Sequence, residues 1–325
     1  MSGEFDIIAK YFAPLATDEG AFGLTDDAAF IAPFIATKDV LVEGVHFRSN
    51  DPLDLVAKKA LRVNLSDLAA KGAKPAGYLL GCVWPMGVKE EAIADFARGL
   101  GEDQELFRVS LLGGDTTVHG LKGAPLTISV TMFGAPSSGG VTRRNGAQAG
   151  DDVYVTGTIG DAGLGLRALT GVIKPAAGAK KLFADRYRLP APRLAAGGAL
   201  AGLASSAIDV SDGLLADAAH IAETSGVAID IAAEKIPISS AARVWLDAQT
   251  NRNAAIADLA GMGDDYEILF TAPQSRRRSI EMAGQVTKTP IIRIGTVLRG
   301  KGVRLLSENA RPIDAPKRGW DHFGR

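Results

Sequence analysis

The chain has 325 residues, 46% hydrophobic and 22% charged, which is the composition of an ordinary globular protein with enough length for two domains. Its formal net charge of -1 gives no electrostatic basis for binding nucleic acid or an anionic membrane surface. The single cysteine, Cys82, excludes an intramolecular disulfide, and no apolar stretch reaches the roughly 18 uncharged residues of a membrane span.

The N-terminal half alternates between helical spacing and short apolar runs. We expect helices at 5–11, at 52–63 continuing to about 72, and at 89–101, and strands at 34–37, 78–83, 109–112 and 126–134. Asp51 should cap the second helix, with Pro52 at its first position. The run at 109–112 should be a buried strand that stops at Gly113-Gly114-Asp115, where the glycines let a bulky group approach the backbone.

The densest run of turn residues, at 136–140, predicts a boundary between domains at 1–138 and 139–325. Beyond it we expect helices at about 157–169, 190–203 and from 211, and strands at 153–156, 207–210, 267–271 and 291–298. Helices and strands mix without strict alternation, which favours α+β sheets covered by helices on one side. The first residues lack the basic and apolar segments of a signal peptide, so we expect a cytoplasmic protein.

Acidic residues recur in six turn-like places, each beside Gly, Ser or Thr. They are Asp26/Asp27, Asp39, Asp67, Asp115, Asp209/Asp212 and Asp264/Asp265. Each alone suits a turn or a helix cap. If several converge, their repulsion calls for a hard divalent cation, and carboxylate oxygens suit Mg²⁺ or Ca²⁺. Zinc is poorly served by one Cys and four scattered His. Because Mg²⁺ commonly binds together with phosphates, we expect a nucleotide or a phosphorylated metabolite as the ligand.

The usual ATP-binding motifs are missing: the chain has no G-x-x-x-x-G-K-[ST] loop and no H-R-D with D-F-G pair. Residues 163–168 match the loose G-x-G-x-x-A pattern, but close packing of a helix explains these glycines equally well. Arg143 and Arg144 could clamp phosphate oxygens or form a solvated basic pair. No Ser/His/Asp or Cys/His arrangement supports a nucleophile. Direct in-line phosphoryl transfer, driven by positioning and charge neutralisation, is the chemistry that remains.

Six motifs occur in this order along the chain: Leu24-Thr25-Asp26-Asp27-Ala28-Ala29, Asp39-Val40-Leu41-Val42-Glu43-Gly44-Val45-His46-Phe47, Val63-Asn64-Leu65-Ser66-Asp67-Leu68-Ala69-Ala70, Leu112-Gly113-Gly114-Asp115-Thr116-Thr117, Ile208-Asp209-Val210-Ser211-Asp212-Gly213-Leu214 and Gly263-Asp264-Asp265-Tyr266-Glu267. Together they resemble the motifs of the thiamine-monophosphate kinases, in the aminoimidazole ribonucleotide synthetase-like superfamily. The resemblance runs from Gly3-Glu4-Phe5 to Trp320-Asp321-His322-Phe323, essentially the whole chain.

The resemblance implies ATP-dependent phosphorylation of thiamine monophosphate to thiamine diphosphate, assisted by several Mg²⁺ ions. It also implies a homodimer, with an N-terminal α/β domain whose strands build a barrel-like dimer interface and a C-terminal α+β domain. The implied metal ligands are Asp27, Thr37, Lys38, Asp39, Asp67, Asp115, Asp209 and Asp212. The implied ATP contacts are Phe107, Gly114, Asp115, Arg144 and Ser211, and the implied contacts to the thiamine phosphate are His46, Asp264 and Trp320. Trp320 would stack on a ring of the substrate.

Three positions depart from the family pattern. Lys38 stands where the family has Thr, and its cation could neutralise a carboxylate or point outward. Phe107 replaces a frequent Tyr, and Asp264 replaces the usual Glu with a side chain one methylene shorter. Two other functions remain open: a different ATP-using relative, such as an aminoimidazole ribonucleotide synthetase or a selenophosphate synthetase, and a non-catalytic nucleotide- or metal-binding protein. Residues 1–25 contain no Cys, which selenophosphate synthetases normally carry near the N-terminus.

Overall fold

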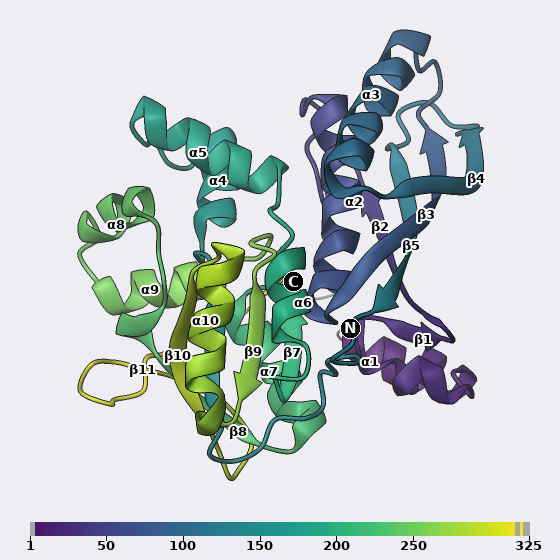
Figure 1. The fold of residues 1–325 in the computed structure, drawn as a ribbon. Coiled ribbons are helices and arrows are strands. Elements are labelled where there is room, and N and C mark those ends of the chain that lie inside the picture. Colours follow the sequence, from purple (N-terminus) through teal and green to yellow (C-terminus); the bar gives the residue numbers. More distant parts are fainter. Residues whose placement is uncertain (1–3, 316–318, 321–325) are drawn as a thin grey trace.

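The computed structural model of the chain describes residues 4–315, 319 and 320. Two sheets organise it, one with five strands from residues 29–136 and one with six strands from residues 152–306 (Figure 1). The predicted boundary after residue 138 falls in the connection between them. Gly3 and Asp321-His322-Phe323, at the two ends of the predicted resemblance, lie outside the described residues. None of the described helices is long and apolar enough to cross a membrane.

The N-terminal half combines a short helical segment, the first sheet and two long helices. Its elements are α1 (Glu4–Ile7), a π-helical turn (Ile8–Phe12), 3₁₀ turns (Ala13–Leu15 and Glu19–Leu24), β1 (Ala29–Ile31), β2 (Phe34–Val42), α2 (Leu53–Ala70), β3 (Ala73–Trp84), α3 (Glu90–Phe107), β4 (Ser110–Val118) and β5 (Thr127–Pro136). The strand order is β1-β2-β5-β3-β4. All helices and strands predicted for this half are confirmed, but β2, β3, α3 and β4 are longer than expected.

Helix α2 covers one face of this sheet and is itself covered by α3. Twelve of its eighteen residues are buried, because it lies between the sheet, α3 and the C-terminal half. The predicted Asp51 cap is wrong: the N-cap position is Pro52, and no side chain caps the helix. Asp51 instead accepts a hydrogen bond from the Arg48 amide (3.0 Å) and forms an ion pair with Arg188 (2.6 Å), which draws its carboxylate away from the helix end.

Strand β4 differs most from its prediction. It does not stop at the glycines but continues through Asp115 to Val118, and all nine of its residues are exposed at the edge of the sheet. Gly114 has φ +155°, and a Cβ there would lie 1.8 Å from the Leu80 carbonyl oxygen on β3. The neighbouring strand therefore already requires this glycine, with no ligand present.

The C-terminal half surrounds the second sheet. Its elements are β6 (Asp152–Thr156), α4 (Asp161–Leu169), α5 (Ala177–Arg188), α6 (Leu194–Leu200), β7 (Ser206–Asp209), α7 (Leu214–Ser225), β8 (Ala228–Ala232), a 3₁₀ turn (Ala233–Lys235), α8 (Ser240–Asp247), α9 (Arg252–Ala260), β9 (Ile268–Ala272), a 3₁₀ turn (Gln274–Arg276), α10 (Arg277–Thr287), β10 (Ile291–Leu298) and β11 (Gly302–Leu306). The strand order is β11-β8-β10-β6-β9-β7. The expected strands β6, β7, β9 and β10 and helices α4, α6 and α7 are confirmed, whereas α5, α8, α9, α10, β8 and β11 were not predicted.

Helices cover both faces of the second sheet, so the expectation of one covered side is wrong for this half. Helices α7 and α9 share one hydrophobic core with Val153 and Val155 of β6. The intervening Tyr154 points to the other face, where it packs with residues of α6 and α10. Ala69 of α2 belongs to that second core as well. Helix α2 thus joins the two halves of the molecule.

The contact between α2 and α6 depends on a glycine. A Cβ at Gly197 would lie 1.9 Å from the Ala69 carbonyl oxygen, whereas a Cβ at the adjacent Gly198 would meet nothing within 4 Å. Gly197 therefore sets how closely the two halves approach.

We expect Gly197→Ala to lower the free energy of unfolding by roughly 1–3 kcal/mol, because the added methyl group overpacks the helix contact. The matched control Gly198→Ala adds the same methyl group in open space, and it should leave stability unchanged or raise it by about 0.5–1 kcal/mol through helix propensity. Thermal and urea unfolding of the two variants would measure this. Equal stabilities would contradict the assigned role of Gly197.

Candidate functional site

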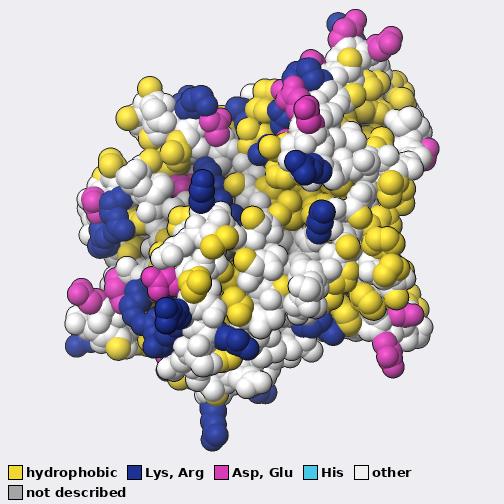
Figure 2. Space-filling view, in the orientation of Figure 1, with side chains coloured by type: hydrophobic (Ala, Val, Ile, Leu, Met, Phe, Trp, Pro, Cys, Tyr) yellow, Lys and Arg dark blue, Asp and Glu magenta, His cyan; other side chains and the backbone are white. Residues whose placement is uncertain are grey.

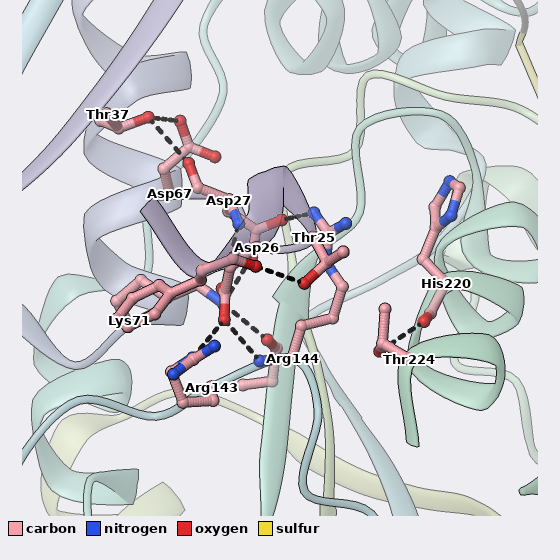
Figure 3. Close-up of polar contacts among 12 residues, drawn as sticks. Thr25, Asp26, Asp27, Thr37, Asp67, Lys71, Arg143, Arg144, His220 and Thr224 are labelled. Carbon is pink, nitrogen blue, oxygen red and sulfur yellow. Dashed lines mark hydrogen bonds and ion pairs between the residues drawn. The ribbon is translucent and has the colours of Figure 1, made fainter. Parts of the chain in front are cut away.

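Four carboxylates converge where the two halves meet. Asp27 precedes β1, Asp39 lies on β2, Asp67 on α2 and Asp209 at the end of β7. Carboxylate oxygens of Asp27, Asp67 and Asp209 all lie within 4.8 Å of one another, and Asp39 lies near enough to Asp67 for its charge to raise the pKa of that carboxyl. The hydroxyl of Thr37 donates to Asp67 and to the Asp27 carbonyl oxygen (3.2 Å), as Figure 3 shows. We call these four acids the junction carboxylates.

Three of the junction carboxylates hold their protons unusually tightly. Burial raises the pKa of Asp39 to about 6 and that of Asp209 to about 7, and nearby carboxylates, Asp27 among them, add to both shifts. Burial and the charge of Asp39 likewise raise the pKa of Asp67 well above its ordinary value. Without a compensating cation, keeping these three groups ionised costs folding free energy.

The donor set of this site suits a hard cation. All its donor atoms are carboxylate or hydroxyl oxygens, and Oδ2 of Asp39 is buried without a hydrogen-bond partner among the described residues. Oxygen donors of this kind are the ligands of Mg²⁺ and Ca²⁺. The junction carboxylates therefore suit a divalent cation, and the assignment of Asp27, Thr37, Asp39, Asp67 and Asp209 as metal ligands stays a prediction.

Asp27 differs from the other three because cations already surround it. Arg144 donates to Oδ1, and Lys71 Nζ lies 2.6 Å from Oδ2 (Figure 3). Burial alone would raise the pKa of Asp27, but the charges of Arg144 and Lys71 lower it to about 2. The adjacent Asp26 pairs with Lys71 (2.6 Å) and Arg143 (2.8 Å). Arg143 and Arg144 are thus part of a buried ionic network and not a solvated basic pair.

An open cleft of about 510 Å³ adjoins these residues. Asp26, Asp27, Thr37 and Lys38 line it together with apolar side chains of the N-terminal helical segment. The ammonium of Lys38 donates to Ser129 Oγ on β5 (2.5 Å), and its side chain is exposed. Its charge has a small lowering influence on the pKa of Asp39, which burial raises. The cleft gives a solvent route to the junction carboxylates.

A second group of possible metal ligands lies at the start of α7. Donor atoms of Asp212, Asp217 and His220 fall within 4.8 Å of one another. Asp217 is buried, which raises its pKa well above the ordinary value, and the charges of Asp212 and Asp209 add to that shift. Burial lowers the pKa of His220 to about 4, so the ring is neutral near pH 7. Asp212, one of the predicted ligands, therefore lies next to the junction carboxylates and not apart from them.

Two of the predicted substrate contacts are joined by a buried lysine. Lys59 of α2 donates to the His46 carbonyl oxygen (2.9 Å) and to Asp264 Oδ2 (3.1 Å). Its ammonium also lies 4.0 Å from the centre of the Tyr187 ring. Asp264 has φ +68°, a conformation that is unfavourable for a non-glycine residue. His46 and Asp264, far apart in sequence, are thus held together.

The remaining C-terminal candidates lie on three segments that are hydrogen-bonded to one another: the loop before α7, the loop before β9 and the segment at residues 319–320. The amide of Asp264 donates to the Ser211 carbonyl oxygen (2.8 Å), and the amide of Trp320 donates to that of Asp212 (3.0 Å). Trp320 is 51% exposed, so a ligand can reach this residue. Tyr266 connects the loop before β9 to the metal site, since burial, Asp264 and the charges of three junction carboxylates all raise its pKa. Ser211, Asp264 and Trp320 therefore lie near the junction carboxylates.

Three predicted ATP contacts are not brought to this place. Asp115 and Gly114 lie on β4, and Phe107 ends α3 just before it, under the guanidinium of Arg62 (5.4 Å). The strand register aligns Asp39 with Val130, Leu80 and then Gly114, so three strand spacings separate β2 from β4. This amounts to roughly 14 Å across the sheet. Within one chain, Asp115 cannot share a metal with Asp39.

Sequence reasoning missed the two buried lysines of this region. Lys59 and Lys71 are 2% and 1% exposed, which is rare for lysine. The available signal was spacing: Lys71 follows Asp67 by four residues and therefore lies on the same face of α2. The loose glycine pattern at 163–168 is explained by packing, because a Cβ at Gly165 would lie 2.1 Å from the Phe183 carbonyl oxygen of α5.

Comparison with known proteins gives a consistent result. Residues 25–135 match the AIR synthase related protein N-terminal domain, and residues 148–306 match the C-terminal domain of the same family. The chain is 42% identical to the thiamine-monophosphate kinase of Caulobacter vibrioides, covering 98% of this chain and 90% of the relative. It is 35% identical to that of Escherichia coli K12, covering 99% and 98%. A solved structure described as AaThiL complexed with AMPPCP and TMP superposes with a TM-score of 0.84, at 28% identity over 99% of this chain and 97% of that chain.

We expect Mg²⁺ to raise the melting temperature much more at about pH 8 than at about pH 5.5, because Asp39, Asp67 and Asp209 have raised folded-state pKa values and protons compete with the metal. Without metal, the stability of the protein itself depends on pH in the opposite direction. The folded state then binds more protons than the unfolded chain, so these groups make the protein more stable as the pH falls from 8 towards about 5.5.

Thermal unfolding at the two pH values, with and without Mg²⁺, measures both effects. Asp209→Asn is the control variant and should show a smaller Mg²⁺ response at about pH 8. A Mg²⁺ response that depends neither on pH nor on Asp209 would contradict the assignment of the metal site.

Proposed function

We propose, on the premise that this chain belongs to the thiamine-monophosphate kinase family of AIR synthase related proteins, that it transfers a phosphoryl group from ATP to thiamine monophosphate and forms thiamine diphosphate. The chain is a kinase whose acceptor is a phosphate group. The observation that carries the proposal is the convergence of Asp27, Asp67 and Asp209 from both halves on one place. A structural relative described with AMPPCP and TMP bound supports the two substrates.

The mechanism we propose is direct in-line transfer. The junction carboxylates with Thr37 and Asp212 would hold Mg²⁺ ions, which neutralise phosphate charge and bring donor and acceptor together. Arg144, buried beside Asp27 and hydrogen-bonded to it, would contact ATP phosphates, and Ser211 would contact ATP from the loop between β7 and α7.

On the acceptor side, the loop around Asp264 would recognise thiamine monophosphate. The Lys59 ammonium fixes Asp264 and the main chain of His46 in one arrangement, so both enter binding already ordered. The exposed indole of Trp320 would stack on a ring of the substrate. Because Asp264 is held in a left-handed conformation, the loop directs its shorter side chain towards Lys59.

The predicted ATP contacts on and beside β4 imply that the active site forms in a homodimer. Since Asp115 lies three strands away from Asp39 in the same chain, it can complete a metal site only at the junction carboxylates of a second copy. Gly114 and Phe107 would reach ATP from the same side. We therefore propose that each active site combines the junction carboxylates of one chain with β4 of its partner.

The surface supports a second copy as the occupant. Hydrophobic side chains gather over the first sheet, at the right of Figure 2, on the face that α2 does not cover. Leu111, Leu112 and Val118 of β4 are exposed, and so are Ile31 and Val40 near the opposite edge. An edge strand with unpaired backbone groups and exposed apolar side chains tends to pair with a strand of another chain. If the first sheets of two chains close into one barrel, the exposed edges of both sheets are paired.

Purified protein with ATP, Mg²⁺ and thiamine monophosphate should form thiamine diphosphate, while free thiamine should be a poor acceptor because it lacks the phosphate that the metal site binds. Chromatographic separation of the thiamine esters measures both reactions. Absence of turnover with saturating substrates would contradict the proposal, and faster turnover with free thiamine would contradict the acceptor.

Asp115→Ala and Asp209→Asn should each abolish activity in the pure variant. Mixed and reassociated, they should regain about a quarter of wild-type activity, because half the dimers are then mixed and each holds one intact site. A tagged mixed dimer purified by two affinity steps measures this directly. Continued inactivity of a correctly formed mixed dimer would contradict the shared site and place Asp115 and Asp209 in the same chain's site.

A further inference from the structure

Lys71 is a buried ammonium inside an acidic site. It is 1% exposed and lies at the end of α2, one turn after Asp67. A buried ammonium is costly unless it is paired and fully hydrogen-bonded. Lys71 is paired with two carboxylates, since its Nζ lies 2.6 Å from both Asp26 Oδ1 and Asp27 Oδ2. It also donates a hydrogen bond to the Ala207 carbonyl oxygen (2.9 Å).

These three contacts connect both halves of the site. Asp26 and Asp27 precede the first sheet, while Ala207 lies on β7 two residues before Asp209. Lys71 therefore holds the loop of one junction carboxylate against the strand of another. Figure 3 shows Lys71 beside Asp26 and Asp27, with Arg143 and Arg144 also close to these acids.

The effect of this cation is visible in how the four acids differ. Among the described residues, no lysine or arginine forms an ion pair with Asp39, Asp67 or Asp209. Asp27 differs, because Lys71 and Arg144 both form ion pairs with it.

We propose that Lys71 replaces one divalent cation of the metal site. It supplies beside Asp26 and Asp27 positive charge that a further metal ion would otherwise have to supply, and it keeps the two halves of the site together before any metal binds. The chain should therefore bind one divalent cation fewer than its carboxylates alone would hold. This inference rests on the proposed function, because it assumes that the junction carboxylates bind metal.

The test is to count bound Mn²⁺, without ATP or thiamine monophosphate, by equilibrium dialysis with electron paramagnetic resonance detection. Lys71→Met removes the charge and keeps the length of the side chain. We expect about one more ion per chain than in the wild type, and a first ion bound roughly tenfold more tightly, because a nearby unit charge has been removed. The metal-free variant should also melt at a lower temperature, and Mn²⁺ should restore more of that loss than it adds to the wild type.

Lys59→Met is the matched control. It removes another buried lysine of α2, paired with Asp264 and not with Asp27, so it should lower stability without changing the number of bound ions. Lys71→Arg keeps the charge and should keep the wild-type number. If Lys71→Met unfolds without metal, saturating Mn²⁺ should refold it.

An unchanged ion number and affinity in folded Lys71→Met would overturn the proposal, and so would a variant that stays unfolded in Mn²⁺ while Lys71→Arg folds. Because turnover is not read, failure of the kinase assay leaves this test intact. A wild-type chain that binds no Mn²⁺ would contradict the metal site of the proposed function itself.

Discussion

The structure depends on placing four ionisable acids in a buried junction between two domains. Burial and the neighbouring like charges both oppose ionisation of these acids, and for both reasons the pKa values of Asp39, Asp67 and Asp209 are raised. The cost of keeping them ionised is tolerable only where cations offset it. Two of them, Lys71 and Arg144, are built into the chain at Asp27, and the rest must come from solution. The same buried carboxylates that would bind the catalytic metal ions therefore destabilise the metal-free folded state.

Helix α2 makes this junction. It covers the first sheet, contacts α6 and β7 of the other half, and carries Lys59, Asp67 and Lys71 over its length. Its close approach to α6, allowed by Gly197, sets the separation between the N-terminal acids and Asp209. A displacement of this helix would alter the metal site and the loop of Asp264 together, because Lys59 and Asp67 move with it.

Most of the junction could be predicted from the sequence, because the residues that build it lie in local motifs. Asp27 and Asp209 lie beside strand ends, Asp39 lies within β2, and Asp67 lies in the last turn of α2, each in a short motif that the sequence displays. Asp115 has the same local signature, but its position depends on strand order, and the parallel pairing of β3 with β4 puts it at the far edge. The importance of Lys71 was also hidden, since a lysine at a helix end is normally solvated and only the domain contact buries it. The cover on both faces of the second sheet was missed because helices such as α10 were not predicted. Helix α10 begins without a capping side chain that would mark its start in the sequence.

The central claim is that the junction carboxylates bind divalent cations that in turn bind the phosphates of ATP. Anomalous diffraction from crystals of the chain soaked in Mn²⁺ and a non-hydrolysable ATP analogue tests it most directly. We predict peaks within bonding distance of Asp39, Asp67 and Asp209, with phosphate oxygens of the analogue on the same ions. An analogue bound with its ions elsewhere, and no peak among these three carboxylates, would contradict the account.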